Sequence, residues 1–235
     1  MGGSFGSGAH GAEQVGRRLT NVLEVLSIGL GERLVPYEEG LATQRKIHEE
    51  VVRGDRPNTL ILLEHEAVYT AGKRTELDER PQDGTPVVDV DRGGKITWHG
   101  PGQLVGYPIV RLPDPVDVVG YVRRLESMLI DVISTFGVSG QRVDGRSGVW
   151  LPRGLTHDKI AAIGIRVASG ITMHGFALNC NNSLDAYDSI IACGIRDAGV
   201  TTLSLASGNE IRPCDVLENV ITSFRNEFEV AHELS

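Results

Sequence analysis

The pattern of apolar and polar residues along the chain predicts a mixture of strands and helices. Apolar-rich stretches without helical periodicity predict strands at 22–27, 60–63, 86–90, 148–151, 159–167 and 175–179. Apolar side chains that recur every three or four residues predict helices at 37–52, 116–136, 185–191 and 213–228. Helices occur early, centrally and late, without the strict strand–helix alternation of a doubly wound parallel sheet, so the pattern favours an α+β fold.

The N-terminal part of the chain differs in composition from the rest. It is rich in glycine and serine, and we expect residues 1–20 to form a flexible tail. No internal repeat and no Pro- or Gly-rich linker divides residues 21–235. We therefore expect these residues to form a single globular domain.

Charge and composition exclude several classes of function. The 235 residues include 23 basic and 31 acidic ones, and the resulting net charge of -8 argues against nonspecific binding to nucleic acid or to anionic membranes. No apolar run approaches the roughly 20 residues of a spanning helix, and no secretory signal is visible, so a cytoplasmic location is expected. The three cysteines, Cys180, Cys193 and Cys214, lack C-x-x-C spacing, which indicates neither a disulfide framework nor a zinc site.

A glycine-rich stretch at 92–104 is the densest motif. Glycine lets a backbone pass close to a ligand and offers N–H groups to a carbonyl or an anion. The spacing fits neither the dinucleotide fingerprint nor the phosphate-binding loop. From spacing alone, a binding turn and an ordinary hairpin between two strands remain equally open.

Cys193 and Lys159 carry the candidate chemistry. A thiol and an amine form a nucleophile–base pair if folding brings them together. By residue type alone, Cys193 would be a small buried hydrophobe and Lys159 a solvated strand-edge lysine. His99 and His174 each precede glycine, but too few further ligands cluster with them to indicate a metal site.

Five segments, taken together and in this order, resemble the lipoyl(octanoyl) transferases. They are Glu64-His65-x-x-Val68-Tyr69-Thr70, Arg92-Gly93-Gly94-x-x-Thr97-Trp98-His99-Gly100-Pro101-Gly102-Gln103, Lys159-Ile160-Ala161-Ala162-Ile163-Gly164, His174-Gly175-Phe176-Ala177-Leu178-Asn179 and Cys193-Gly194. The resemblance implies the fold of the catalytic domain of biotin and lipoate protein ligases, a mixed, largely antiparallel sheet with packed helices. One departure is Ala192, where the family commonly has proline before the nucleophile.

The resemblance also implies a reaction. The family moves an octanoyl group from acyl carrier protein to a specific lysine of lipoyl domains, the first step of endogenous protein lipoylation. By matching position, Cys193 corresponds to the acylated nucleophile and Lys159 to its partner. A thiol that attacks a thioester conserves the energy of the bond, so neither ATP nor a cofactor or metal is expected.

A larger set of residues corresponds to the family's substrate-binding positions. It comprises Arg92, Gly93, Gly94, Thr97, His99, Gly100, Gly102, Gln103, Ala161, Ile163, Gly164, His174, Gly175, Ala177, Gly194, His65 and Tyr69. For His65, a core histidine remains an alternative. Trp98, Ile96, Leu104 and Met173 are candidates for the lining of an acyl tunnel, although a core role is as well supported for each.

The expected partners are octanoyl-acyl carrier protein as donor and, as acceptors, lipoyl domains of 2-oxoacid dehydrogenase complexes and glycine cleavage H protein. A monomer is expected. Because acyl carriers are acidic, the net acidic chain needs a local basic patch. The candidates for this patch are Arg17, Arg18, Lys73, Arg74, Arg123, Arg124, Arg142 and Arg146.

Two alternative functions remain open. One is an ATP-dependent lipoate or biotin ligase on the same fold, and the other is a non-catalytic module that binds lipoylated domains or acyl carriers.

Overall fold

The centre of the molecule is a mixed β-sheet. The computed structural model describes residues 23–82, 84–190 and 198–228. Within them the sheet has the order β1 (Leu23–Ile28), β2 (Asn58–Leu63), β6 (Gln103–Ile109), β10 (Ile171–Asn179), β9 (Thr156–Ala168), β8 (Arg146–Arg153), β7 (Gln141–Val143), and β11 (Gly199–Val200) pairs with β9. The β1–β2 and β9–β11 pairs are parallel and the other pairs are antiparallel. The prediction of a mixed, largely antiparallel sheet is therefore confirmed.

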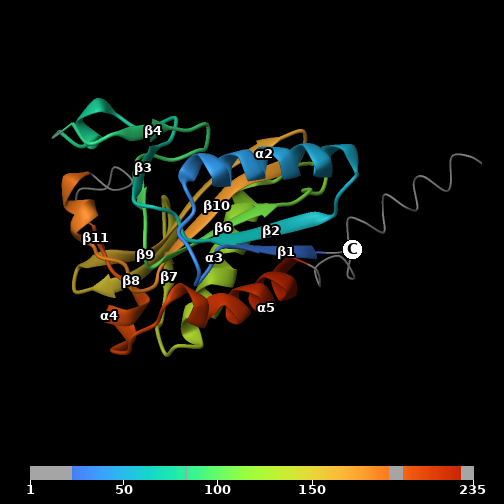
Figure 1. The fold of residues 1–235 in the computed structure, drawn as a ribbon. Helices are drawn as coiled ribbons and strands as arrows, with labels where there is room; N and C mark the ends of the chain where they lie inside the picture. The colour runs from blue at the N-terminus through green and yellow to red at the C-terminus, as the bar shows by residue number, and fades with distance from the viewer. Residues whose placement is uncertain (1–22, 83, 191–197, 229–235) are drawn as a thin grey trace, which may run out of the picture.

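A second, smaller sheet lies beside the main one. It contains β4 (Val87–Asp89), β3 (Val68–Ala71) and β5 (Thr97–His99), in that order. β5 and the residues before it belong to the glycine-rich stretch. The stretch therefore connects the small sheet to β6 of the main sheet, as Figure 1 shows.

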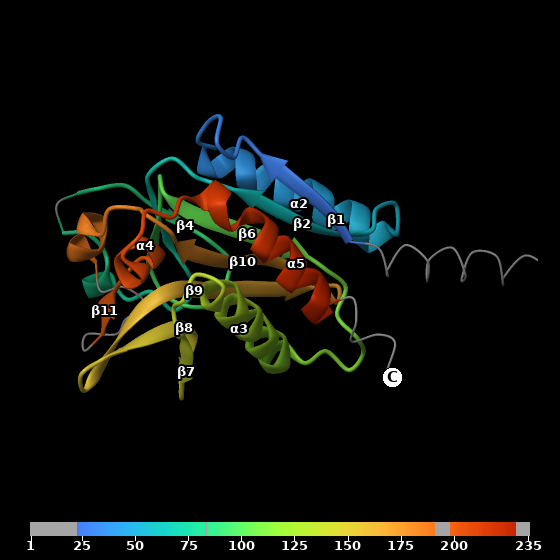
Figure 2. The same cartoon turned by 90° about the horizontal axis from the view of Figure 1, so that it is seen from below.

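Helices cover both faces of the main sheet. α2 (Tyr37–Arg53) packs on β6 and β10, whereas α3 (Val118–Ser134) packs on β8 and β9 and against α5 (Leu217–Phe228). Figures 1 and 2 show α2 on one side of the sheet and α3 with α5 on the other. Shorter helical segments are η1 (Leu77–Glu79), η2 (Asp185–Ser189), α4 (Leu203–Ser207) and η4 (Pro213–Val216).

β2 shows why the sheet needs a cover on both faces. Its last four residues, Leu60 to Leu63, are apolar in succession, and side chains alternate between the two faces of a strand. Leu60 and Leu62 pack in the cluster that contains the buried residues of α3 and α5. Ile61 and Leu63 pack in the second cluster, with the buried residues of α2. The core thus has two layers, separated by the sheet.

Most predicted elements are present: β2, β8, β9 and β10 are longer than the pattern indicated, whereas β4 is shorter. The helix predicted at 37–52 is α2, and the one at 116–136 is α3, whose N-terminus Asp117 caps by accepting a hydrogen bond from the Gly120 backbone at 2.8 Å. The helix at 213–228 consists of η4 followed by α5, and the prediction at 185–191 yields only η2. Among the described residues, no helix is long and apolar enough to cross a membrane.

Candidate active site

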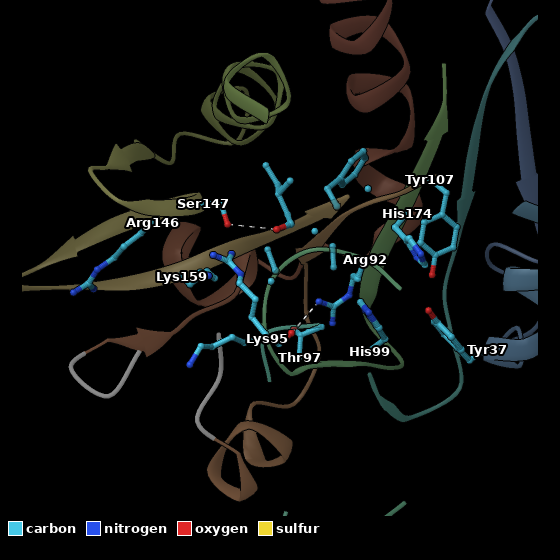
Figure 3. A pocket seen from close by; sticks show the side chains of 18 of the residues that line it. Tyr37, Arg92, Lys95, Thr97, His99, Tyr107, Arg146, Ser147, Lys159 and His174 are labelled. Carbon is cyan, nitrogen blue, oxygen red and sulfur yellow. Dashed lines mark hydrogen bonds between the residues drawn. The ribbon is translucent and has the colours of Figure 1, made fainter. Parts of the chain in front are cut away.

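A cavity of about 600 Å³ opens where the glycine-rich stretch meets β9 and β10 (Figure 3). Its walls come from segments far apart in the sequence. The lining residues are Tyr37, Arg74, Arg92, Gly94, Lys95, Thr97, His99, Tyr107, Gly145, Arg146, Ser147, Lys159, Ala162, Ile163, Gly164, His174, Gly175, Phe176 and Ala177. This is the place where most of the residues matched to the family's site come together.

Lys159 reaches the cavity from β9 and is held by an aromatic ring. It pairs with Trp150 on β8 and with Val200 on β11. Its side chain is only 8% exposed, and its Nζ lies 4.4 Å from the centre of the Trp150 ring. No carboxylate among the described residues forms an ion pair with it. The face of an aromatic ring attracts a cation, so Trp150 fixes the position of the amine.

Arg92 shapes the glycine-rich wall of the cavity. Its Nη1 donates to the carbonyls of Gly93 at 3.0 Å and Lys95 at 2.9 Å. Its Nη2 donates to the carbonyl and the hydroxyl of Thr70, at 2.8 and 2.9 Å. The buried guanidinium thus clamps the stretch onto β3. Close packing also requires Gly72, because a Cβ there would lie 2.5 Å from the Gly94 carbonyl oxygen.

His99 enters the cavity as a neutral ring in one tautomer. Gln103 donates from Nε2 to Asn179 Oδ1 at 2.9 Å and to the Trp98 carbonyl at 3.2 Å, so its Oε1 faces His99 Nδ1 at 2.8 Å. From this network we assign the proton to Nδ1, which leaves Nε2 as an acceptor. Burial lowers the pKa of His99 to about 3. His99 therefore offers a lone pair and no positive charge.

His65 acts on the cavity through a tyrosine. Its Nδ1 lies 2.8 Å from the Val35 carbonyl, which can only accept, and its Nε2 lies 2.6 Å from the Tyr107 hydroxyl. Burial lowers the pKa of His65, so the ring is neutral. Its Nε2 therefore accepts a hydrogen bond from the Tyr107 hydroxyl. His65 itself is fully buried and does not line the cavity, whereas Tyr107 does.

His174 adopts a backbone conformation that is rare for a residue with a side chain. Its φ is 57°, and its backbone N–H donates to Gln44 Oε1 at 2.8 Å. Its Nε2 lies 2.9 Å from Asp91 Oδ1, and Asp91 also forms an ion pair with Arg166. Burial lowers the pKa of His174. Burial also opposes ionisation of Asp91, but the hydrogen bond from His174 lowers the pKa of the Asp91 carboxyl. The cluster ties the start of the glycine-rich stretch to β9 and β10.

The structure brings many of the predicted site residues to the cavity and places others behind it. Those that line it are Arg92, Gly94, Thr97, His99, Lys159, Ile163, Gly164, His174, Gly175 and Ala177. Those that do not are His65, Tyr69, Gly93, Gly100, Gly102, Gln103 and Ala161. Cys193 and Gly194, like residues 1–20 and Ala192, lie outside the described residues.

Several of the residues behind the wall support it. Gln103 orients His99, and Tyr69 donates to the Ala186 carbonyl at 2.6 Å. A Cβ at Gly102, whose φ is 82°, would lie 2.6 Å from the Asn182 backbone nitrogen. Ala161 belongs to the core that contains α3, whereas its neighbour Ala162 lines the cavity.

The four tunnel candidates lie in packed clusters and not on the cavity wall. Ile96 and Trp98 pack with Tyr69, Leu104 lies in the core that contains α3, and Met173 lies in the core that contains α2. The apolar wall is formed instead by Ala162, Ile163, Phe176 and Ala177. Within the described ranges, no three His, Cys, Asp or Glu side chains are grouped as a metal site requires.

Sequence reasoning missed several lining residues. They are Tyr37, Lys95, Tyr107, Gly145, Ser147, Ala162 and Phe176. Arg74 and Arg146 also line the cavity, and the sequence had indicated them only as candidates for the basic patch. Lys95, Ala162 and Phe176 stand inside the motifs already recognised, so their position was a usable signal. Tyr37 and Tyr107 come from α2 and β6, and nothing in the pattern indicates that these elements meet at a site.

Comparison with known proteins places this arrangement in one class. The model of the lipoyl protein ligase A/B catalytic domain matches residues 36–225. The bipartite lipoate protein ligase system of Thermoplasma acidophilum includes a structure with a TM-score of 0.65 at 15% identity, covering 87% of this chain and 82% of that one. This likeness shows the fold alone. The fold is thus that of a lipoyl protein ligase A/B catalytic domain.

Two relatives narrow the class. The octanoyltransferase of Leifsonia xyli subsp. xyli is 64% identical over 202 residues, which are 85% of this chain and 90% of that protein. The octanoyltransferase of Clavibacter sepedonicus is 61% identical over 201 residues, 83% of this chain and 87% of that protein. The chain therefore belongs to the octanoyltransferases of the lipoyl protein ligase A/B family.

Proposed function

We propose that the chain transfers an octanoyl group from acyl carrier protein to a lysine of lipoyl domains, and that Cys193 and Lys159 carry the acyl and proton transfers. Octanoyl transfer follows from the relatives, and the observation that supports the catalytic pair is the position of Lys159. Its amine is buried in the cavity wall and has no carboxylate partner among the described residues. Such an amine is available to exchange protons with a reacting group.

In the first half-reaction, the sulfur of Cys193 attacks the thioester carbonyl of the donor. A new C–S bond forms to Cys193, the C–S bond to the carrier breaks, and the carrier thiol leaves. The neutral amine form of Lys159 takes the proton of the Cys193 thiol, and the resulting ammonium passes it to the departing carrier thiolate. No net proton is consumed, and the bond energy of the thioester is retained in the acyl-enzyme.

In the second half-reaction, the amine of the acceptor lysine attacks the Cys193 thioester. An amide C–N bond forms, the C–S bond breaks, and Lys159 conducts the proton from the attacking nitrogen to the Cys193 thiolate. The described residues that flank Cys193 in the sequence support this pairing, because β11 pairs Val200 with Lys159 and the Thr201 backbone donates to the Lys159 carbonyl at 3.0 Å.

The acyl chain is assigned to the apolar part of the cavity. Ala162, Ile163, Phe176 and Ala177 supply this surface. Each CH₂ group that leaves water contributes about 0.8 kcal/mol, so an apolar wall favours a medium-length chain over a short one. The Gly94 backbone, which lines the same cavity, and the Gly194 backbone are proposed to donate to the developing oxyanion.

The partners extend the proposal. The donor is octanoyl-acyl carrier protein, and the acceptors are lipoyl domains of 2-oxoacid dehydrogenase complexes and glycine cleavage H protein. We propose that residues 21–235 act as a single catalytic domain, as a monomer in the cytoplasm.

An ATP-dependent lipoate ligase is the alternative function, since solved ligases share the fold. This alternative is less supported, because the chain is 15% identical to the ligase system and 64% identical to an octanoyltransferase.

Intact mass spectrometry tests the acyl-enzyme. Wild-type protein, Cys193→Ala and Lys159→Ala are incubated with octanoyl-carrier protein, without ATP and without acceptor. We expect an octanoyl adduct on wild type that disappears when apo lipoyl domain is added, no adduct on Cys193→Ala, and a much slower one on Lys159→Ala.

Cys214→Ala is the matched control, because Cys214 is exposed and lies outside the cavity. It should form the adduct as wild type does. If no variant forms an adduct and transfer requires ATP and free octanoic acid, the ligase alternative replaces the proposal.

A further inference from the structure

The cavity wall is cationic, although the chain as a whole is acidic. Five basic side chains line it: Arg74, Arg92, Lys95, Arg146 and Lys159. No described lining residue is Asp or Glu, whereas the whole chain carries a net charge of -8. Burial keeps the lining histidines neutral by lowering the pKa values of His99 and His174, so the positive charge comes from arginine and lysine.

The charge is concentrated toward one end. In Figure 3, Arg146, Lys159 and Lys95 lie on one side of the cavity, and Tyr37 and Tyr107 lie on the opposite side. Lys159 is buried, whereas Arg146 is half-buried. Basic groups thus occur both at the exposed part of the cavity wall, at Arg74, and at the buried amine where we place the chemistry.

Arg92 and Lys95 are engaged with neighbouring groups of the protein. Arg92 is engaged with the backbone of the glycine-rich stretch and with Thr70. Lys95 is paired with the buried carboxylate of Glu79. Arg74 differs, because it is exposed, and its guanidinium contacts no described partner, while its backbone N–H donates to the Gly94 carbonyl at 3.2 Å. Arg146 reaches the same cavity from β8, with its guanidinium 5.6 Å from the centre of the Trp150 ring.

We propose that Arg74 and Arg146 form a phosphate-binding subsite for the prosthetic arm of the donor. The inference rests on the proposed function. Neither an octanoyl chain nor a thioester carries charge, so the reacting group does not account for cations at the mouth. The arm that presents an acyl group on a carrier protein is attached through a phosphodiester, and arginine binds phosphate oxygens with paired N–H donors.

The subsite also explains how a net acidic protein can bind an acidic carrier protein. Cations focused in a concave site attract an anion locally, even when the net charge of the protein is negative. The phosphate would be held at the mouth while the thioester extends inward to Lys159. A phosphate of the same kind occurs in an acyl-adenylate, so the test must separate these two sources.

The experiment compares octanoyl-phosphopantetheine, octanoyl-pantetheine and octanoyl-adenylate as donors to apo lipoyl domain, with wild type, Arg74→Gln and Arg146→Gln. We expect wild type to have a higher kcat/KM for octanoyl-phosphopantetheine than for octanoyl-pantetheine. Each substitution should lower the ratio of these two values by about tenfold, as expected for the loss of one hydrogen bond to a charged group.

Arg153→Gln is the matched control, because Arg153 is an exposed basic residue of β8, the strand that carries Arg146, and does not line the cavity. Its ratio should equal that of wild type. The subsite would be overturned if a substitution lowered kcat/KM equally for both thioesters, or if wild type did not prefer the phosphorylated thioester. In either case, transfer from octanoyl-pantetheine would still support the proposed function. A loss confined to octanoyl-adenylate would reassign the subsite to a ligase. Absence of transfer from every thioester would instead refute the proposed function.

Discussion

At the scale of single residues, the contact between Lys159 and Trp150 links sequence to chemistry. The two residues are directly paired across β8 and β9, and the amine lies 4.4 Å from the ring centre. A long lysine side chain has several rotatable bonds, and ordering it costs entropy. The aromatic face offsets part of that cost and directs the amine into the cavity. In the proposed mechanism, Trp150 is therefore a positioning residue, which acts through Lys159.

Substitution of Trp150 measures this contribution. We expect Trp150→Leu to lower kcat by about tenfold, since a cation over an aromatic face is stabilised by roughly 0.5–2 kcal/mol and 1.4 kcal/mol corresponds to a factor of ten. Trp150→Phe keeps an aromatic face and should retain most of the rate. Both variants remove buried volume, so a purely structural role would lower kcat in proportion to the loss of stability measured by urea unfolding.

At the scale of elements, the start of β8 determines how the hairpin with β9 is aligned. Gly148 has a φ of 102°, and its backbone N–H donates to the buried carboxylate of Glu126 on α3 at 3.0 Å. The register between β8 and β9 shifts next to it, between Val149 and Trp150. Such an irregularity re-aims the side chains that follow. It places Trp150 opposite Lys159.

Two glycine substitutions in this hairpin separate backbone strain from packing. A Cβ at Gly148 would lie 2.4 Å from the Ala161 carbonyl oxygen, whereas one at Gly154, whose φ is 58°, would have no neighbour within 4 Å. We expect Gly154→Ala to cost about 1–2 kcal/mol, the strain of a left-handed conformation. Gly148→Ala should cost more and should also lower kcat.

The measurement is urea unfolding of both variants, together with kcat at saturating donor. Equal losses of stability in the two variants would show that the Ala161 carbonyl moves aside and that the packing argument is wrong.

At the scale of the whole molecule, burial of neutral histidines around one cavity connects stability to pH. Burial lowers the pKa values of His65, His99 and His174 below the ordinary 6.5. Below that pH the unfolded chain binds protons that the folded chain excludes. The stabilisation is therefore complete above about pH 6.5 and is lost as the pH falls, for His99 through a window that extends to about pH 3.

The free energy of unfolding should decrease between pH 7 and pH 5. Each such histidine contributes up to about 1.4 kcal/mol per pH unit once its unfolded form is protonated. In His99→Gln the slope should be shallower than in wild type, whatever its absolute stability. Urea titrations at several pH values measure the slopes, with His157→Gln, outside the cavity, as reference. Identical slopes in wild type and His99→Gln would contradict the assignment.

The sequence pattern predicted those helices and strands in which the buried side chains recur at regular positions. α2 and α3 follow from helical periodicity, and β2 follows from a short apolar run between polar flanks. β6 was not predicted, because Gly106 and Pro108 interrupt its pattern. In the folded chain, a Cβ at Gly106 would lie 2.2 Å from the Phe176 ring, and the Pro108 carbonyl accepts a hydrogen bond from the Thr172 hydroxyl at 2.6 Å. These contacts depend on neighbours that are distant in sequence.

The sequence by itself determined the class of chemistry. The glycine-rich stretch, the Lys159 segment and the Cys193-Gly194 pair identify the family because their order and residue types are specific. Only the tertiary structure decided that Trp150 holds Lys159 and that Arg74 and Arg146 share one cavity. It also decided that Ala162, and not Ala161, faces that cavity. The reason is physical: a shift of one residue in strand register turns every side chain to the other face, and register depends on long-range pairing.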